Sequence, residues 1–422
     1  MQSLSQSNDL SNTASPVPDQ EITCSVYTSF EDVSPLQAEW DDFVEANGAD
    51  IFLTFDWCQT WWKYYGHKRL LRIYLFRSNQ EIVGLFPLFS ERIWFGPVFL
   101  DAVKIIGSDH TIAQFYVPIN IDFVEPVTDK LYTLLSQENP DVICMGPLTG
   151  LYPATDPLQK AIHKVLDGRY KTTAKNIGEQ TLFHLAKSWK DQLGKMNKSD
   201  VKDIERSYRR LQKNYNEPTL AVETDICDAE KLTYCFEDFA KMHQDYWHNS
   251  GRAGHFEDWP SALEFHREMA QKQLTRKRLK LLKIFTQKGC LGYEYDYWFG
   301  GKCYEFLAAR SEEEALTGVS VGKINYCEKM KLLIDKKIDF LDSMCGKYIY
   351  KLKLGGNVYD IKCIYSVSRS TFKRLRIMIF CGLSRLLHLA YYKIWYCRLA
   401  QLLPFKRRPL WKLWIRTKFL SH

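Results

Sequence analysis

The chain has 422 residues, enough for two or three domains, and its 45% hydrophobic and 25% charged residues exclude an intrinsically disordered protein. Its 12 cysteines are scattered singly, without a Cys-x-x-Cys pair or a Cys/His cluster, which excludes a disulfide scaffold and a structural zinc site. The net charge of +7 is unevenly distributed, because residues 366–422 contain 13 Lys and Arg and no Asp or Glu. We therefore expect a mildly acidic body and a basic tail with an anionic partner.

Residues 1–20 are rich in Ser, Asn, Asp and Pro and contain neither a basic start nor an apolar core. They predict a disordered leader and not a signal peptide. No run of 18 uncharged apolar residues occurs, since the nearest one, 377–392, is interrupted by Arg385 and His388. We therefore expect no membrane-spanning helix and a cytoplasmic protein.

Strand and helix patterns alternate through the body, which predicts an α/β (α+β) fold. In the first half, strands are predicted at 22–27, 71–76, 81–89, 92–99 and 141–145, and helices at 35–45, 57–65, 129–136 and 156–166. In the second half, helices are predicted at 198–214, 229–243 and 260–273, strands at 279–285, 290–298 and 301–309, and then a glycine turn, a helix and a strand at 338–341. Segments 81–96 and 289–300 show a faint repeat, each with a strand, a glycine, an apolar strand and a Trp-Phe-Gly turn.

Two sets of short motifs carry a family resemblance. Near the start these are Trp40, Trp57, the pair Trp61-Trp62 and Gly84-Leu-Phe-Pro-Leu88. Near the end they are the turn before Lys323, then Asp339-Phe-Leu, Gly346 and Tyr350-Lys351. Their order over residues 25–355 resembles the GNAT-like acetyltransferases of the CelD-type cellulose-biosynthesis proteins and, more distantly, the FemABX peptidyltransferases.

The resemblance implies two GNAT-like mixed-sheet units in tandem, at residues 21–170 and 171–365, followed by a helical basic tail at 366–422. It also implies acyl-CoA as co-substrate, with no permanently bound cofactor. The Arg/Gln-x-x-Gly-x-Gly/Ala loop of standard acetyltransferases is absent, so the donor remains open.

The donor site is predicted at the turn that precedes the helix of the second unit. Gly318, Val319, Ser320, Val321, Gly322 and Lys323 bring backbone amides, a hydroxyl and an ammonium to a helix N-terminus, where an anion such as the CoA pyrophosphate is favoured. The alternative is an ordinary glycine turn with Ser320 as N-cap. The segment is not a P-loop, because Ile324 stands where Ser or Thr is required.

Three residues are candidates for catalysis. Asp339 can orient or deprotonate an attacking amine or hydroxyl, and Lys351 can stabilise the developing oxyanion. Asp109, in a loop after an apolar strand, is a candidate base in the acceptor cleft. The alternatives are a strand-end Asp339, a solvent-exposed Lys351 and a turn built on Asp109.

Substrate contacts are predicted from Arg209, Trp247 and Arg252. Arg209 lies on a basic helix that can grip a phosphate, although a solvated helix face would give the same pattern. Trp247 and Arg252 lie close in sequence and can line a sugar or acyl pocket.

We predict an acyltransferase that moves an acyl group from acyl-CoA to an amine or hydroxyl of a sugar-nucleotide or lipid-linked saccharide in envelope or exopolysaccharide biosynthesis. The alternatives are a FemABX-like transferase that uses aminoacyl-tRNA, the only case in which nucleic acid binds, and a catalytically degenerate assembly factor at a membrane surface. After Pro404, Leu410, Leu413 and Trp414 share one helix face and Arg408, Lys412 and Arg416 the opposite one. This pattern predicts peripheral binding to anionic lipid on the inner face of the cytoplasmic membrane.

Overall fold

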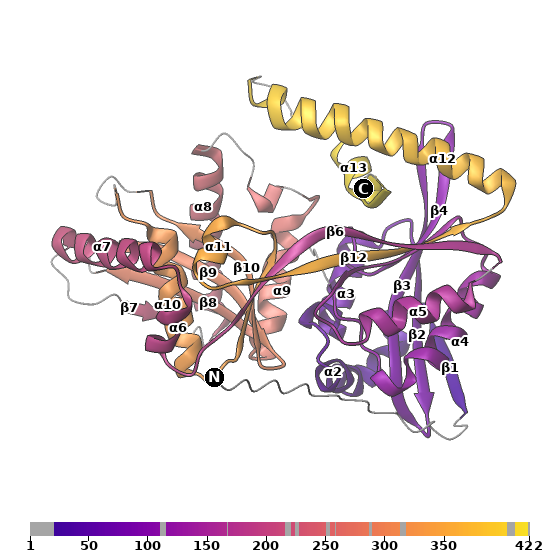
Figure 1. Ribbon diagram of the computed structural model, residues 1–422, viewed down its shortest axis with the longest axis horizontal. Helices are drawn as coiled ribbons and strands as arrows, with labels where there is room; N and C mark the ends of the chain where they lie inside the picture. Colours follow the sequence, from indigo (N-terminus) through magenta and orange to yellow (C-terminus); the bar gives the residue numbers. More distant parts are fainter. Residues whose placement is uncertain are drawn as a thin grey trace, which may run out of the picture.

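A computed structural model of the chain describes residues 21–109, 115–166, 168–215, 221–223, 228–249, 254–257, 259–286, 289–312, 318–402 and 410–420. These residues form one twelve-stranded mixed sheet with helices on its faces (Figure 1). The strand order is β1-β2-β3-β4-β5-β12-β6-β11-β10-β9-β8-β7. The predicted α/β class is confirmed. The leader 1–20, Arg252 and Arg408 lie outside the described residues.

The first half of the chain builds one end of the sheet. Its strands are β1 (Ile22–Tyr27), β2 (Leu70–Ser78), β3 (Glu81–Phe95), β4 (Val98–Ile105) and β5 (Val142–Thr149). Its helices are α1 (Phe30–Val33), α2 (Gln37–Ala46), α3 (Phe55–Tyr65), α4 (Val124–Gln137) and α5 (Thr155–Val165). The tryptophans of the opening motifs are core residues, since Trp40, Trp57 and Trp61 are all fully buried.

The second half builds the other end of the sheet. Its strands are β7 (Ala221–Glu223), β8 (Leu279–Thr286), β9 (Gly289–Phe299), β10 (Lys302–Arg310) and β11 (Phe340–Cys345). Its helices are α6 (Trp189–Lys195), α7 (Lys198–Tyr215), α8 (Ala229–Asn249), α9 (Ala262–Thr275), α10 (Val321–Asp335) and α11 (Ile349–Lys353). Lys351, a catalytic candidate, thus lies in the short helix α11.

Two long strands that the sequence does not predict join the halves. Strand β6 (Tyr170–His184) pairs with β11 of the second half, and β12 (Asn357–Ser368) pairs with both β6 and β5. The predicted unit boundaries near residues 170 and 365 therefore fall at the start of β6 and inside β12. One continuous sheet connects the two units.

One predicted strand is wrong. Residues 92–99 do not form a single strand, because β3 continues to Phe95 and the chain reverses before β4 begins at Val98. Gly96 occupies the turn with φ +59°, a left-handed conformation that glycine adopts without steric cost.

The tail folds onto the body. Helix α12 (Thr371–Leu386) continues as a π-helix, η6 (Leu387–Leu399), and α13 (Trp411–Thr417) returns beneath it (Figure 1). Phe380 is fully buried, with its ring 6.2 Å from that of Phe95. Two residues of the predicted apolar face are packed, since Leu413 and Trp414 are partly buried and the Trp414 ring stacks on Tyr392 at 4.3 Å. The third, Leu410, is 45% exposed.

The helix Thr371–Leu399 is long and apolar enough, by length and composition alone, to cross a membrane. The sequence predicts no such helix because Arg385 interrupts the apolar run. Only about a quarter of its most apolar window, 28%, is buried in the protein. The exposed face of this helix therefore requires an explanation.

Candidate active site

Strands β10 and β11 diverge and open a cavity in the second unit. They pair in parallel only where Lys302–Tyr304 face Phe340–Asp342. Beyond this point a bulge between Glu305 and Leu307 bends β10, which stays paired with β9 as far as Arg310. The cavity beside it has a volume of about 820 Å³ and is lined by the second half of β10, the start of α10, the end of β11, and residues of α8 and α11.

The N-terminus of α10 points unsatisfied donors toward this cavity. Among the described residues, no acceptor is found for the backbone amides of Gly322 and Lys323. The Ser320 side chain makes no capping hydrogen bond to the helix, and its hydroxyl donates to Asp203 at 3.3 Å. The two free amides and the helix dipole make this N-terminus a candidate site for an anion.

Two cationic side chains, Lys323 and Arg310, border this N-terminus, and they differ in whether carboxylates already pair with them. Lys323 Nζ donates to Asp200 at 2.8 Å and to Asp203 at 2.9 Å. Burial opposes protonation of Lys323, but the two carboxylates outweigh it and raise its pKa. Arg310, which sequence reasoning missed, lies over the Tyr246 ring at 4.1 Å and within contact distance of Gly322.

Lys351 lies buried in the cavity wall. Its Nζ donates to the Ser343 carbonyl at 2.6 Å, while the Ser343 hydroxyl donates to Glu305 at 2.7 Å. Burial lowers the pKa of Lys351, and the nearby Glu305 counteracts this only in part. Tyr326, which is also buried, donates its hydroxyl to the same Glu305 carboxylate. Glu305 of β10, Tyr326 of α10, Ser343 of β11 and Lys351 of α11 thus form one hydrogen-bonded polar cluster.

A buried ion cluster lies beside this polar cluster. Lys329 on α10 is fully buried, with its Nζ 2.6 Å from Glu294, 3.6 Å from Asp296 and 3.7 Å from Glu305. Burial raises the pKa of Glu294 to about 7, although Lys329 acts in the opposite direction. Because Glu305 belongs both to this cluster and to the Ser343 contact, Lys329 positions a carboxylate at the cavity.

Trp247, near the end of α8, also lines the cavity. Its ring packs edge-on against His255 at 5.1 Å, and His255 faces His243 with a nitrogen–nitrogen distance of 3.0 Å. Burial lowers the pKa of His243 to about 3 and that of His255 to about 4, so this pair is neutral at physiological pH. This part of the cavity wall can therefore receive an uncharged acyl or sugar group.

Two described candidates, Asp339 and Arg209, do not line this cavity. The Asp339 side chain is 57% exposed and pairs with Lys187 at 2.7 Å. Arg209 is exposed on α7, where its neighbour Arg210 contacts the Gly318 carbonyl instead. Arg252 lies outside the described residues.

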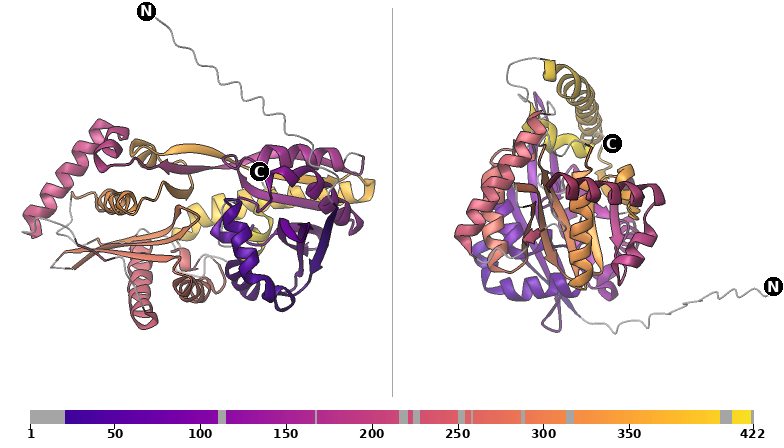
Figure 2. Two further views of the ribbon diagram at one scale, coloured as in Figure 1. Left: turned by 90° about the horizontal axis from the view of Figure 1, so that it is seen from below. Right: turned by 90° about the vertical axis from the view of Figure 1, so that its left-hand side faces the viewer.

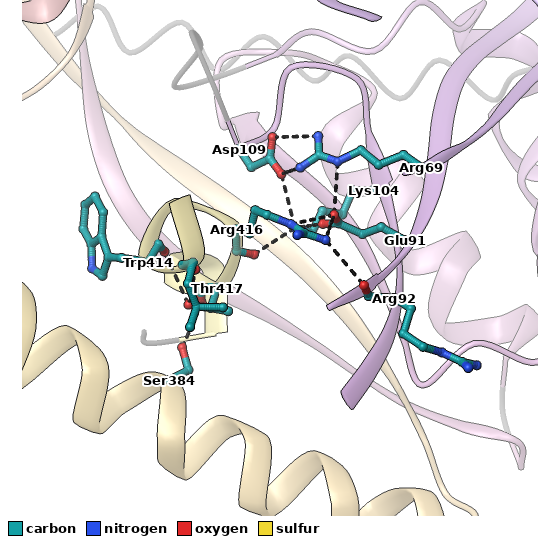
Figure 3. A network of polar contacts seen from close by, with 10 residues as sticks. Arg69, Glu91, Arg92, Lys104, Asp109, Ser384, Trp414, Arg416 and Thr417 are labelled. Atoms are coloured by element: carbon teal, nitrogen blue, oxygen red, sulfur yellow. Dashed lines mark hydrogen bonds and ion pairs between the residues drawn. The ribbon is translucent and has the colours of Figure 1, made fainter. Parts of the chain in front are cut away.

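Asp109 lies in a separate, buried network of the first unit (Figure 3). Its carboxylate contacts Arg69 at 2.6 Å and Lys104 at 3.5 Å. Glu91 forms ion pairs with the same two cations, Arg69 and Lys104, and also accepts a hydrogen bond from Arg416 of the tail at 2.7 Å. Asp109 is therefore held by two cations and lines only a small cavity of about 190 Å³. Its environment is that of a structural ion network that also anchors α13.

Sequence reasoning missed Glu305, Arg310, Ser343, Lys329 and Glu294, because their roles depend on which strand faces which. A local signal exists only for the alternating Glu294 and Asp296 in an aromatic strand, where charges on the buried face require a partner. In the part of the chain that is described, no group of three or more His, Cys, Asp or Glu is placed to hold a metal ion.

Residues 198–352 match the family model described as "Acetyltransferase (GNAT) domain". The matched region spans α7 to α11 and contains the cavity described above, so this part of the chain is a GNAT acetyltransferase domain, which supports an acyltransferase. No curated protein sequence matches the chain.

Among solved structures, the chain is similar to FemX, with a TM-score of 0.56 and 11% identity over 84% of this chain and 99% of FemX. This likeness shows the fold, and with the family match it confirms the predicted GNAT and FemABX resemblance. The structure of L-PGS from Bacillus licheniformis (TM-score 0.43, 10% identity, 81% of this chain and 95% of the other) is also similar. So is a tandem GNAT protein from the clavulanic acid biosynthesis pathway (TM-score 0.41, 11% identity, 83% of this chain and 99% of the other).

Proposed function

We propose that this chain transfers an acyl group from acyl-CoA to an amine or hydroxyl of a saccharide precursor, a sugar nucleotide or a lipid-linked sugar. The observation that carries the proposal is the cavity between the diverging β10 and β11 of the GNAT domain, with the free amides of α10 at one end. The saccharide as acceptor rests on the family resemblance stated above.

In this proposal, the pyrophosphate of the donor lies at the amides of Gly322 and Lys323, with Arg310 as its cationic partner. The acyl chain and thioester extend along the unpaired edge of β10 toward Lys351. The Lys351 ammonium stabilises negative charge that develops on the thioester oxygen. The acceptor nitrogen or oxygen bonds to the carbonyl carbon, the carbon–sulfur bond breaks, and the acceptor's proton passes to Glu305 or to water while CoA leaves as thiolate.

A second candidate is transfer from aminoacyl-tRNA, as in the FemABX resemblance. The observation that favours it is the engagement of Lys323 by Asp200 and Asp203, which leaves the phosphate site with fewer available cations than expected. A thermal-shift screen separates the two, because a ligand of the folded state raises its apparent stability. Acetyl-CoA and free CoA raise the melting temperature in the first case, whereas only aminoacyl-tRNA does so in the second.

The donor site is tested by Gly322→Glu. Because a Cβ at Gly322 would meet only Arg310 at 3.6 Å, the variant should fold. Its carboxylate repels the pyrophosphate and pairs with Arg310, so we expect the CoA-dependent thermal shift to disappear.

The matched control is Gly194→Glu, which adds the same charge on α6 at a position with open space around it. It should keep the full thermal shift. An unchanged shift in Gly322→Glu would remove the donor site from this helix N-terminus.

We also propose that the protein works at the inner face of the cytoplasmic membrane. A lipid-linked saccharide presents its sugar at that surface, and a tail without acidic residues is attracted to anionic headgroups.

A further inference from the structure

We infer that the outer face of helix α12 and the following η6 is a docking surface for an anionic lipid bilayer, on which the helix lies parallel to the membrane plane. The inference rests on the proposed function only in that the proposed function explains why the protein would bind a membrane. The binding itself can be measured without catalysis.

The first observation is that this helix is apolar on two opposite faces. Ile377, Phe380, Ser384, Leu387 and Tyr391, spaced by three and four residues, are buried against the body. Phe372, Leu375, Ile379 and Leu386, spaced by three, four and seven, point the other way. Their exposure is high, 90% for Phe372 and 60% for Leu386. Globular proteins rarely leave such a continuous apolar row in water.

The position of the helix leaves this row accessible. In Figure 1 and in the right-hand view of Figure 2, α12 and η6 run along the upper edge of the molecule, with the described body beneath them. Beside α12 rises the β3–β4 hairpin, whose Trp94 is 54% exposed. Tryptophan is typical of the membrane–water interface.

The charges around the row identify the partner. Arg374, Arg385, Lys393 and Arg398 are exposed, and within the described chain none of them has an ion-pair partner. No Asp or Glu occurs anywhere in residues 366–422. An apolar row with unpaired cations and without anions complements an anionic bilayer, in which acyl chains meet negative headgroups.

The inner face of the helix argues against a spanning orientation. Arg376 contacts the buried Asp141, and the Ser384 hydroxyl donates to the Thr417 carbonyl at 2.9 Å. A spanning helix would separate Phe380 and Tyr391 from the body and place Arg376 and Arg385 in hydrocarbon. We therefore assign this helix to the membrane surface.

The assignment moves the membrane contact away from α13. Trp414, on which the sequence-based expectation depended, stacks on Tyr392 inside the tail. A truncation before α12 would expose Phe95 and the rest of its buried cluster, so it could not separate lipid binding from folding. Point variants of the full chain are the appropriate test.

The experiment is flotation of the full chain with vesicles of phosphatidylcholine alone or mixed with phosphatidylglycerol. We expect binding to the anionic vesicles and release by alkaline carbonate. The double variant Leu375→Ser/Ile379→Ser should need at least about tenfold more lipid for half-maximal binding at any salt concentration. Arg374→Gln/Arg385→Gln should lose binding mainly at low salt, where headgroup attraction is not screened.

The matched control is Tyr234→Ser, which removes an exposed aromatic ring from α8 in the second unit and should bind vesicles like the unmodified chain. The inference is overturned if the unmodified chain does not float, if Leu375→Ser/Ile379→Ser binds normally, or if bound protein resists carbonate. It is also overturned if tRNA displaces the protein completely. A retained CoA-dependent thermal shift in the double variant separates failure of this inference from failure of the proposed transferase.

Discussion

Lys351→Met is expected to lower turnover by roughly 10²-fold or more, because it removes a buried ammonium from the wall of the donor cavity. The Ser343 carbonyl loses its partner, but the Ser343 hydroxyl still reaches Glu305 and the cavity keeps its shape. The measurement is thiol release from acetyl-CoA with the best acceptor of an amino-sugar and amine panel. Circular dichroism establishes that the variant remains folded at the assay temperature.

Two readouts distinguish a role in catalysis from one in folding. Asp339→Asn serves as the matched control, since that carboxylate is exposed on the surface and pairs with Lys187, and its turnover should be unchanged. Burial lowers the pKa of Lys351, so activity that requires the ammonium should fall, as pH rises, at a lower pH than an ordinary lysine would give. Lys351→Met should lack this alkaline limb. Full activity in Lys351→Met would show that the side chain only supports the wall.

Lys329→Met should destabilise the protein by about 3–5 kcal/mol, because Glu294, Asp296 and Glu305 would remain buried without their shared cation. The free energy of unfolding, from urea titrations, measures the effect. Lys331→Met on the same helix is the control. Lys331 is 34% exposed and pairs with Glu328 at 2.7 Å, so its loss should cost less than about 1 kcal/mol.

The stability lost in Lys329→Met should depend on pH, in a direction set by how the pKa values of the buried carboxyl groups change. With Lys329 present, burial raises the pKa of Glu294 to about 7 and that of Asp296 well above its ordinary value, whereas the nearby Lys329 holds the pKa of Glu305 below its ordinary value despite burial. Without the cation, the folded-state pKa values of all three carboxyl groups should rise. A carboxyl group whose folded pKa is raised stabilises the fold fully below its unfolded pKa, and this stability is lost as pH rises through the folded value. The deficit should therefore be smaller at pH 5 than at pH 8. An equal deficit at both values would contradict a buried charge cluster.

The sequence by itself predicts most of the elements, because local patterns carry the necessary information. Strand β1 and helix α3 follow from hydrophobic periodicity, and the turn before α10 follows from its glycines. The order of weak motifs was sufficient for the GNAT resemblance, and Val319–Lys323 and Lys351, the residues it proposed for the site, line one cavity. These residues lie at or before the start of α10 and in the short helix α11, where short sequence motifs mark their positions.

Only the tertiary structure decided the rest. The central strands β6 and β12 are more than 170 residues apart in sequence, and their pairing has no local signature. Asp339 and Asp342 lie three residues apart, beside and on β11, yet one faces solvent and the other is fully buried, because side chains three residues apart along a strand point to opposite faces of the sheet. The partners of Glu305 and Lys329 come from β9, β10, β11 and α10, which the fold brings together. Local propensity determined the elements, whereas long-range strand register determined which charges are buried together and hence where the chemistry can occur.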